Sequence, residues 1–498
     1  MNPNSPFLVS LSHELRLLRA ESLSTLIGLI LAVAFSYAAW NGTGWAQRQQ
    51  RAVAVAVASH DSHVHDTLTH LSAMEAGTYR PPSAFLNPAN PLWIGLRHAS
   101  TPAALPATAL QAAAVGQSDL FPPYLNVSAD TRDTWSLQED VENPSNLLAG
   151  AFDPAFVAVV LLPLMLIALS YDLLSAEREG GTLALLLTQP VSLTTLLASK
   201  VTARAVVVLG GASLFSALAL VSADPFSTDF LLRIGLWTTL IWAYGLFWLA
   251  LCAAISSQGV SSAAGALILC GMWLLFQLII PTLTGVLAQT VRPSPSRASM
   301  VSEIRTAQDQ ARQRSNASLA HYLREHGDEH PDTPVLHGHD LDDARRRALI
   351  LLDSNTRIER ILDEQEMRRQ DQLGLVAWLR FLSPPVLMQD ALSEVAGSGE
   401  IRLRHFHAQA DSFGARWRTY FLPKALRNEA LSSGDYAHFP VFDYQGLPIS
   451  KLIGEIASIL TGLLVSAALL GLITHRRLKK PATREQLLFA PRHLMSST

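Results

Sequence analysis

The chain has 498 residues, of which 49% are hydrophobic and only 16% are charged, and its formal net charge is −3. Soluble domains carry about a quarter charged residues, so this composition indicates a membrane protein, and the small negative charge gives no support for nucleic-acid binding. The two cysteines, Cys252 and Cys270, lie in apolar stretches and are interpreted as buried thiols rather than as a disulfide or a metal site.

The N-terminal segment, residues 1–22, is predicted to form a cytoplasmic amphipathic helix that lies at the membrane surface. Its apolar side chains recur at spacings of three and four, whereas Glu14, Arg16 and Arg19 are predicted to lie off this apolar face. An ordinary cytoplasmic tail is the alternative.

Six apolar stretches are each long enough to cross a bilayer, which takes about 20 mostly apolar residues. They cover residues 23–40, 155–174, 201–221, 230–255, 260–287 and 452–473. The first could instead be a cleaved signal peptide, but the stretch before it is long and a suitable cleavage region is missing, so a retained anchor is favoured. The predicted fold class is therefore a mainly α-helical, polytopic membrane protein with six transmembrane helices.

Basic residues near the ends of these spans predict the orientation of the chain. Arg16 and Arg19 precede the first span, Lys200 and Arg204 stand where the third begins, and the sequence THRRLKK ends the last. Because Lys and Arg favour the cytoplasmic side, both termini are predicted to be cytoplasmic, including the tail 474–498. The loop formed by residues 175–200 then lies on the same side.

Two large segments are predicted on the opposite, extracytoplasmic side. Residues 41–154 are rich in Pro and Ala and predict loops and short strands, although their beginning can extend the first span as a helix. Residues 288–449 are predicted to be mainly helical, with helices over 296–326, 340–382 and 402–426.

The loop between the second and third spans contains the sequence EREGGTLALLLTQP, residues 177–190. Gly180 and Gly181 allow the backbone to leave the preceding helix, Thr182 can cap a new turn, and Pro190 fixes a turn before the third span. The predicted order is helix, break, short helix, turn and helix. Such a short helix can transmit force to a cytoplasmic partner, and a plain interfacial connector is the alternative.

This loop resembles the coupling segment in the permease subunits of ABC-2-type ABC transporters, which reads roughly E-R-E-x-G-T-L-x-x-L-L-x-x-P-[VI]-S. The residues that match are Glu177, Arg178, Glu179, Gly181, Thr182, Leu183, Leu186, Leu187, Pro190, Val191 and Ser192, followed by Ser199 and Lys200. The stretches HELRLLRAES (13–22) and FLSPPVLMQDALSEVAGSG (381–399) resemble other parts of that family and support the match.

The resemblance implies an ABC-2, type V exporter-like transmembrane domain in a bacterial inner membrane, joined to a mostly helical extracytoplasmic domain. It also implies a separate ATPase subunit that binds ATP and Mg²⁺. This sequence has no G-x-x-x-x-G-K-[ST] motif, so the chain itself is not expected to bind ATP through a P-loop or to carry a cofactor. In this interpretation Glu177, Arg178 and Glu179 contact the ATPase by charge, and the short helix 182–187 docks in a groove. A second permease copy is implied as a homodimer or heterodimer partner. The large outer segments, unusual in the family, favour an additional envelope partner.

Other candidate sites are weaker. His60, His63, His65 and His70 lie close in sequence, as do five histidines between residues 321 and 339, but metal binding needs ligands that converge in space, so solvated polar stretches are favoured. In the fifth span, Gln277 is interpreted as an interhelical hydrogen-bonding group, with a role in a substrate path as the alternative, and Pro281 as a kink.

The sequence therefore predicts the permease subunit of an ATP-driven exporter whose substrate is unidentified. No catalytic residue is expected, because the outer segments lack a nucleophile signature. The alternative is a membrane-anchored scaffold or mechanotransmission subunit that engages an envelope partner without a substrate path. A secondary transporter ranks third, since the spans carry no ionisable group near their centres.

Overall fold

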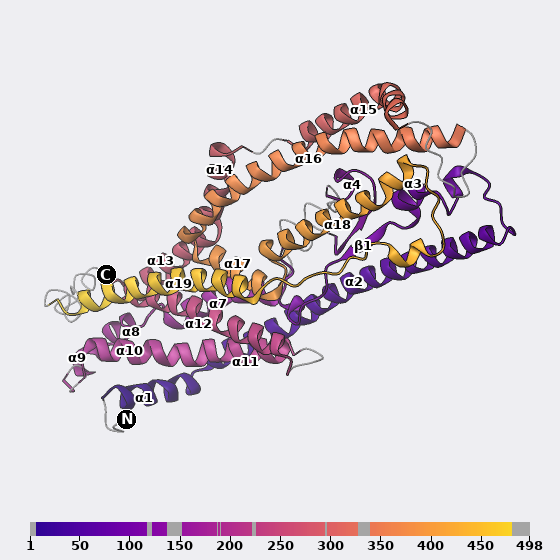
Figure 1. Cartoon of the computed structure of the whole chain (residues 1–498). Coiled ribbons are helices and arrows are strands. Elements are labelled where there is room, and N and C mark those ends of the chain that lie inside the picture. The colour runs from indigo at the N-terminus through magenta and orange to yellow at the C-terminus, as the bar shows by residue number, and fades with distance from the viewer. Residues whose placement is uncertain are drawn as a thin grey trace, which may run out of the picture.

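The computed structural model describes the chain apart from residues 1–5, 117–121, 137–151, 187, 190, 222–225, 294–295, 327–338 and 481–498, and apart from the side chains of 339–342. The described residues form a helical bundle from which a long domain projects to one side (Figure 1). The chain begins at the opposite end of the bundle, which we call the base. Here α1 (Pro6–Ala20) lies beside α8 (Ser175–Glu179), α9 (Leu183–Leu186) and α10 (Leu193–Arg204).

Six helices in the described part of the chain are long and apolar enough to cross a membrane. They are α2 (Ser22–Glu75), the continuous run Pro154–Glu179, the run Leu193–Ala219, α12 (Thr228–Ser256), the run Ser262–Val291 and α19 (Ile449–Leu478). Each contains one of the six predicted spans or most of it. The protein is thus a mainly α-helical, multi-pass membrane protein, as the composition and the apolar stretches predict.

The centre of the bundle is α12, which packs against α19 and α7 (Leu162–Ser170). It buries Trp237, Tyr244 and Trp248, and the hydroxyl of Tyr244 donates a hydrogen bond to the carbonyl of Val159, 2.9 Å away. The outer faces of the fifth span and of α19 instead expose large aliphatic side chains. Apolar side chains in these positions suit contact with lipid, which supports insertion in a bilayer.

Three of the long helical runs contain a widened π-helical turn, at η5 (Val157–Leu161), η6 (Ala205–Leu209) and η7 (Leu275–Ile279). Two of these turns are followed within two residues by a proline, Pro163 in α7 and Pro281 in α14 (Ile280–Val291). Proline cannot donate to the carbonyl four residues back and its ring clashes with it, so a local π turn lets the helix continue. At Pro281, where the sequence predicts a kink, the helix therefore continues through a π-helical turn that ends two residues before the proline.

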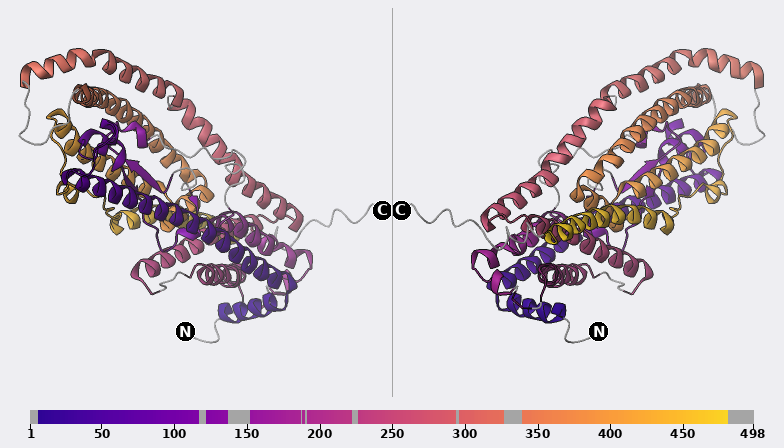
Figure 2. Two further views of the ribbon diagram at one scale, coloured as in Figure 1. Left: turned by 90° about the vertical axis from the view of Figure 1, so that its right-hand side faces the viewer. Right: turned by 90° about the vertical axis from the view of Figure 1, so that its left-hand side faces the viewer.

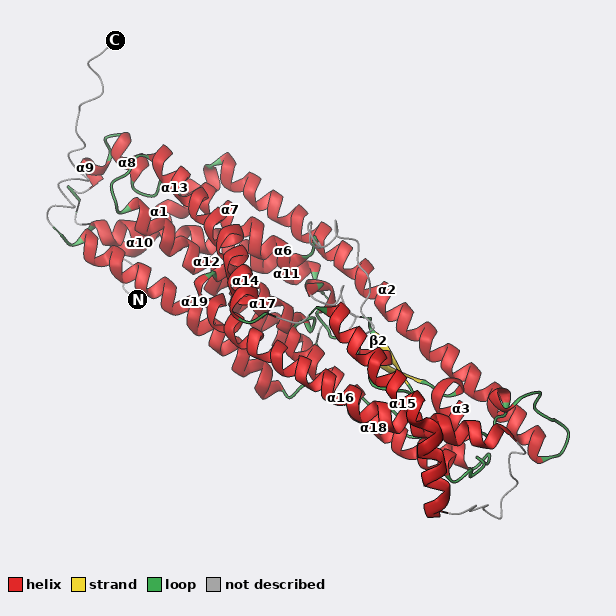
Figure 3. Cartoon of the chain, turned by 90° about the horizontal axis from the view of Figure 1, so that it is seen from above, coloured by secondary structure: helices red, strands yellow, loops and turns green. Residues whose placement is uncertain are grey.

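The projecting domain continues two elements of the bundle. Helix α2 runs from the bundle into this domain without a break, and α14 leads to the long hairpin of α15 (Arg297–His326) and α16 (His339–Leu379), which arches over the rest (Figure 2). Between them lie α18 (Glu400–Leu426) and a two-stranded antiparallel sheet of β1 (Thr101–Ala104) and β2 (Tyr124–Val127) (Figure 3). Smaller elements complete it: η1 (Ala84–Leu86), α3 (Pro91–Trp93), η2 (Ile94–His98), η3 (Gln111–Ala113), α4 (Asp133–Ser136) and η9 (Asp435–His438).

The core of the projecting domain is aromatic, and its charged groups are paired. Trp417, Phe413 and Phe421 of α18 are buried beside the sheet and α3. Arg132 joins α18 to α16, because its guanidinium contacts Asp411 at 2.6 Å and Asp363 at 2.7 Å. These contacts hold the α15–α16 hairpin against the domain.

Helix α17 (Pro384–Ala396) is a buried helix that packs between α12 and α19, and the sequence did not single it out as a separate element. Ser383 caps its start and donates a hydrogen bond to the carbonyl of Phe276, 2.7 Å away. It ends at Gly397, which adopts a left-handed conformation with φ +83°. The carboxylate of Glu394 then accepts a hydrogen bond from the backbone N–H of Ile401, 2.9 Å away, in the first turn of α18.

Burial raises the pKa of Glu394 to about 7, with smaller contributions from Glu455 and Asp390. In the unfolded chain the same group titrates near 4.5, so the folded state binds this proton more tightly and loses stability as the pH rises from about 4.5 to about 7. We expect Glu394→Gln to increase the free energy of unfolding by about 1–3 kcal/mol at pH 8 and to have little effect at pH 4.5. Unfolding of purified protein in detergent at the two pH values measures this. The exposed Glu364→Gln is the control, and an equal effect of Glu394→Gln at both pH values would contradict the prediction.

Candidate functional site

The candidate site lies at the base, where the segment between the second and third spans turns back into the bundle (Figure 1). Helix α8 ends at Gly180, Gly181 has φ +72°, and α9 follows directly. Only glycine adopts such a positive φ at no steric cost, so Gly181 allows the backbone to turn between the two short helices. Ser192 begins α10 by accepting a hydrogen bond from the backbone N–H of Thr195 at 3.1 Å. Leu187 and Pro190 lie outside the described residues.

Glu177 connects α8 to the third span. Its Oε1 lies 3.0 Å from Nζ of Lys200, and its other carboxylate oxygen accepts a hydrogen bond from the hydroxyl of Thr182. One carboxylate therefore fixes both the turn that precedes α9 and the position of α8 relative to α10.

Arg178 and Glu179 connect α8 to the loop between the fourth and fifth spans. The side chain of Arg178 is only 10% exposed, and its guanidinium donates hydrogen bonds to the carbonyls of Gly259 and Val260, the latter at 2.6 Å. Glu179 accepts two hydrogen bonds of 2.8 Å from Ser262, one from its backbone N–H and one from its hydroxyl. Ser262 is the first residue of α13 (Ser262–Leu274), so the carboxylate also interacts favourably with the dipole of that helix.

Glu14 of α1 completes a network of four charges at the base, of which Glu177 is half-buried and the other three are buried. Its two carboxylate oxygens lie 3.7 Å from Nζ of Lys200 and 3.6 Å from Nη1 of Arg204. Glu14 is only 6% exposed, and Lys200 and Arg204 are buried with it. Two carboxylates, Glu14 and Glu177, thus balance two basic groups, and they join α1, α8 and α10.

The position of Glu14 differs from the prediction, which placed it off the apolar face of α1 together with Arg16 and Arg19. Arg16 and Arg19 are exposed, but Glu14 follows Phe7 by seven residues and Leu11 by three, so it shares their face of the helix. That face packs against α10, where Lys200 and Arg204 supply the opposite charges. Glu14 therefore takes part in the site instead of lying at its surface.

The surface that remains open at the base belongs to the glycine turn and α9. Gly181, Thr182 and Ala184 are exposed, and Leu185 is 69% exposed, whereas Leu183 is buried and Leu186 half-buried against the bundle. Glu177 and Arg178 are engaged within the bundle, so the exposed groups that a partner would meet here include the apolar side chain of Leu185 and the carboxylate of Glu179, which is 45% exposed.

Gln277 and Pro281 lie away from the base, in the fifth span. Gln277 belongs to η7 and is half-buried, and its side-chain oxygen has no hydrogen-bond partner among the described residues. The adjacent Phe276 packs edge-on against Phe247 and Trp248 of α12. These residues are not part of the charged network.

The histidine-rich stretches do not form a metal centre in the described part of the chain, where no group of three or more His, Cys, Asp or Glu side chains could hold an ion. His60 and His63 line a polar hollow of about 370 Å³ in the projecting domain. His65 and His70 are not among its lining residues. Of the second stretch, His330 and His337 lie outside the described residues.

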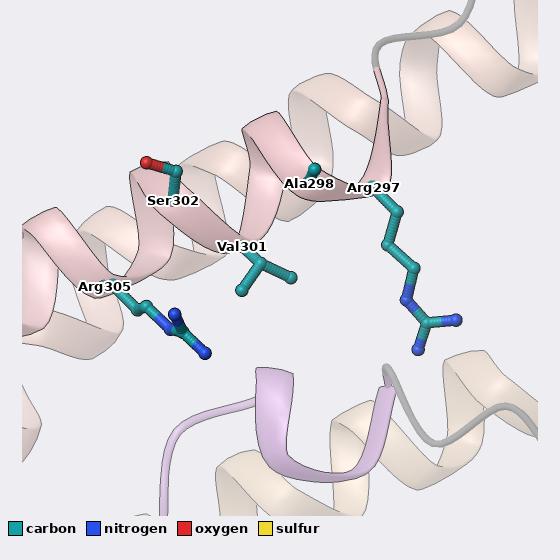
Figure 4. Close-up of a pocket in the computed structure, with 5 residues that line it drawn as sticks. All are labelled: Arg297, Ala298, Val301, Ser302 and Arg305. Carbon is teal, nitrogen blue, oxygen red and sulfur yellow. The ribbon is translucent and has the colours of Figure 1, made fainter.

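A second hollow, of about 450 Å³, lies along the start of α15. Its lining residues are Arg297, Ala298, Val301, Ser302 and Arg305, and the two arginines point across it towards α4 (Figure 4). All five described lining residues belong to α15, so this hollow is a shallow surface feature along that helix.

Comparison with known proteins gives two partial similarities. Residues 297–445 match a family described as "Domain of unknown function (DUF3526)". Over 131 residues the chain is 35% identical to the "Probable ABC transporter permease protein NosY" of Pseudomonas aeruginosa, and this match covers 25% of the present chain and 46% of that protein. The chain thus spans about half the length of the curated relative that it matches.

We expect Glu14→Gln to reduce the free energy of unfolding by about 3 kcal/mol, because Lys200 and Arg204 would remain buried with one carboxylate instead of two. Chemical denaturation in detergent measures this loss. The matched control is Arg16→Gln on the exposed face of α1, which should change stability by less than about 0.5 kcal/mol. Equal stability of the Glu14→Gln variant and the unmodified protein would show that the network contributes nothing to the fold.

Proposed function

We propose that this chain is the membrane permease subunit of an ATP-driven ABC transporter and that α9 is its contact with a separate ATPase subunit. The partial similarity to a probable ABC transporter permease supports the permease role, and the E-R-E-x-G-T-L pattern supports the ATPase contact. In this proposal both termini and the base face the cytoplasm of a bacterial cell, and ATP and Mg²⁺ bind to the ATPase. A second permease copy completes the transporter.

The observation that carries the proposal is the attachment of α8 to two other parts of the bundle. Glu177 binds Lys200 on the third span, and Arg178 and Glu179 bind the loop between the fourth and fifth spans. A displacement of α9 by a partner would therefore move four spans together. An unattached connector would absorb the same displacement in its own backbone.

The contact surface follows from which groups are exposed. The charged motif is engaged within the chain, so we propose that Leu185 and its exposed neighbours dock in an apolar groove of the ATPase. The charges of the motif then act as positioning groups that hold α9 at a fixed angle. Burial of one leucine side chain in such a groove stabilises a complex by about 1.5–3 kcal/mol.

We expect Leu185→Glu to abolish co-purification of the ATPase and Leu185→Met, which keeps an apolar side chain of similar size, to retain it. A cysteine at position 185, cross-linked in native membranes, should capture a protein that carries a G-x-x-x-x-G-K-[ST] motif, identified by mass spectrometry. Normal ATPase recovery with Leu185→Glu, at normal amounts of the membrane protein, would refute the proposed contact.

A second candidate function is favoured by α2. This single helix of 54 residues, about 80 Å long, joins the bundle to the projecting domain. A rigid helix of this length would transmit a movement of the bundle to the domain, as a mechanotransmission subunit without a substrate path requires. Export of a substrate through the bundle and transmission of force to an envelope partner are thus separate hypotheses for the same ATP-driven machine.

Insertion of Gly-Gly-Ser after Arg51 would break α2 between the bundle and the projecting domain. If the chain transmits force, the insertion should abolish the ATP-dependent change in distance between spin labels in the projecting domain and in the bundle, while ATP hydrolysis persists. If the chain exports a substrate through the bundle, ATP-dependent transport into inverted vesicles should survive the insertion. The control is the same insertion after Gln445, in an extended segment of the domain.

A further inference from the structure

The hollow between α2 and the small sheet of the projecting domain has the composition of a binding site for an anion. Two of its walls come from distant parts of the sequence: Ser59, His60 and His63 lie on one face of α2, and Tyr124 and Asn126 lie on one face of β2. The pairing of Pro102 with Asn126 in the sheet fixes the second wall. The hollow has a volume of about 370 Å³, at the lower end of the range for small-molecule sites.

Arg97 and His98 of η2 complete the lining. The guanidinium of Arg97 has neither a hydrogen-bond nor an ion-pair partner in the described ranges, and its residue is exposed at the hollow. Among the described residues, the lining contains no Asp or Glu. A concave surface with one arginine, three histidines and several neutral donors, but no carboxylate, attracts negative charge and repels cations.

The three imidazoles are held in place by their own hydrogen bonds. His60 donates from Nδ1 to the carbonyl of Ser100 at 2.9 Å, and His63 donates from Nδ1 to the carbonyl of Ser59 at 2.7 Å. His98 donates from Nε2 to the carbonyl of Phe85, also at 2.9 Å. Within the described residues, the other nitrogen of each ring has no hydrogen-bond partner, and once protonated it becomes a donor.

We propose that this hollow binds a small molecule that carries a phosphate or carboxylate group. The anion accepts hydrogen bonds from the guanidinium of Arg97, and Ser59, Tyr124 and Asn126 supply neutral donors. Binding draws a proton onto at least one of the three histidines, because an imidazole nitrogen can donate to an oxyanion only in its protonated form. His60 lies 20 residues beyond the predicted first span, about 30 Å along α2, so the ligand comes from solution and not from the bilayer.

The alternative ligand for exposed histidines is a transition-metal ion. Imidazole nitrogens whose partner N–H binds a backbone carbonyl are common metal ligands. However, a metal site usually needs three or more converging ligands, and the described residues contain no such group. The positive charge of the Arg97 guanidinium in the same hollow also disfavours a cation. The anion is therefore the better match, and the metal becomes an outcome of the test.

The test uses the full chain in lipid nanodiscs and isothermal titration with inorganic phosphate, pyrophosphate and citrate at pH 7. We expect saturable binding of one molecule per chain. Tighter binding of phosphate or pyrophosphate would indicate a phosphate site, and tighter binding of citrate would indicate a carboxylate site. Titration in buffers of different ionisation enthalpy should show proton uptake. Failure of all three anions to bind saturably would overturn the proposal, whatever the outcome of the ATPase experiments at the base.

Variants locate the binding. Arg97→Gln and His63→Asn should each weaken anion binding about tenfold or more, because each removes a charge-assisted hydrogen bond. The controls are Arg80→Gln and His65→Asn, which change the same residue types outside the lining and should bind like the unmodified protein. Equal weakening by the controls would also overturn the proposal.

A parallel titration uses Zn²⁺ and Ni²⁺. Metal binding that releases protons, is lost in His60→Asn and His63→Asn, and persists in Arg97→Gln would replace the anion site by a metal site. Anion binding lost in Arg97→Gln, without metal binding, would support the proposal.

Discussion

Charged groups buried at the base must be paired, and this requirement determines how the N-terminal half of the chain assembles. Lys200 and Arg204 lie at the base end of the third span, and both are almost fully buried. An unpaired charge in such surroundings is very costly, so the fold must bring carboxylates to them. Glu14 arrives on α1 and Glu177 on α8, each within 4 Å of a basic group. The amphipathic N-terminal helix is therefore held by charge as well as by its apolar face.

The same pairing changes the interpretation of the E-R-E motif. A run of charges next to a membrane span is ordinarily solvated, and the sequence favoured direct contact between these charges and a partner. In the structure, Arg178 binds two backbone carbonyls of the loop between the fourth and fifth spans, and Glu179 binds the first residue of α13. The motif thus organises the base from within, while the partly exposed carboxylate of Glu179 and the apolar side chain of Leu185 lie on the outer surface.

The sequence predicts well whatever depends on local periodicity and fails where distant segments meet. Apolar runs locate the six long helices, and polar runs of good helix formers coincide with α15, α16 and α18, because each pattern is contained in one continuous stretch. The contacts of Arg178 with Gly259 and Val260 join residues about 80 positions apart, which no local pattern encodes. Helix α17 was missed as a separate element. Its 13 residues are too few for a span, and they are buried only because α12 and α19 enclose them in the folded chain. Glu14 could have been placed correctly, because its spacing from Phe7 and Leu11 is helical.

The continuity of α2 links the two ends of the molecule. One face of α2 packs in the bundle beside α11 (Gly210–Ala219). Further along, α2 supports β1 and forms one wall of the hollow lined by His60 and His63. No loop interrupts it between Ser22 and Glu75, so a tilt of its first half must displace its second half. Helix α17 adds a second connection, because it packs between α12 and α19 while Glu394 at its end holds the first turn of α18. Helices α2 and α17 thus connect the bundle to the projecting domain, and a ligand bound between α2 and the sheet would stiffen the first of these connections.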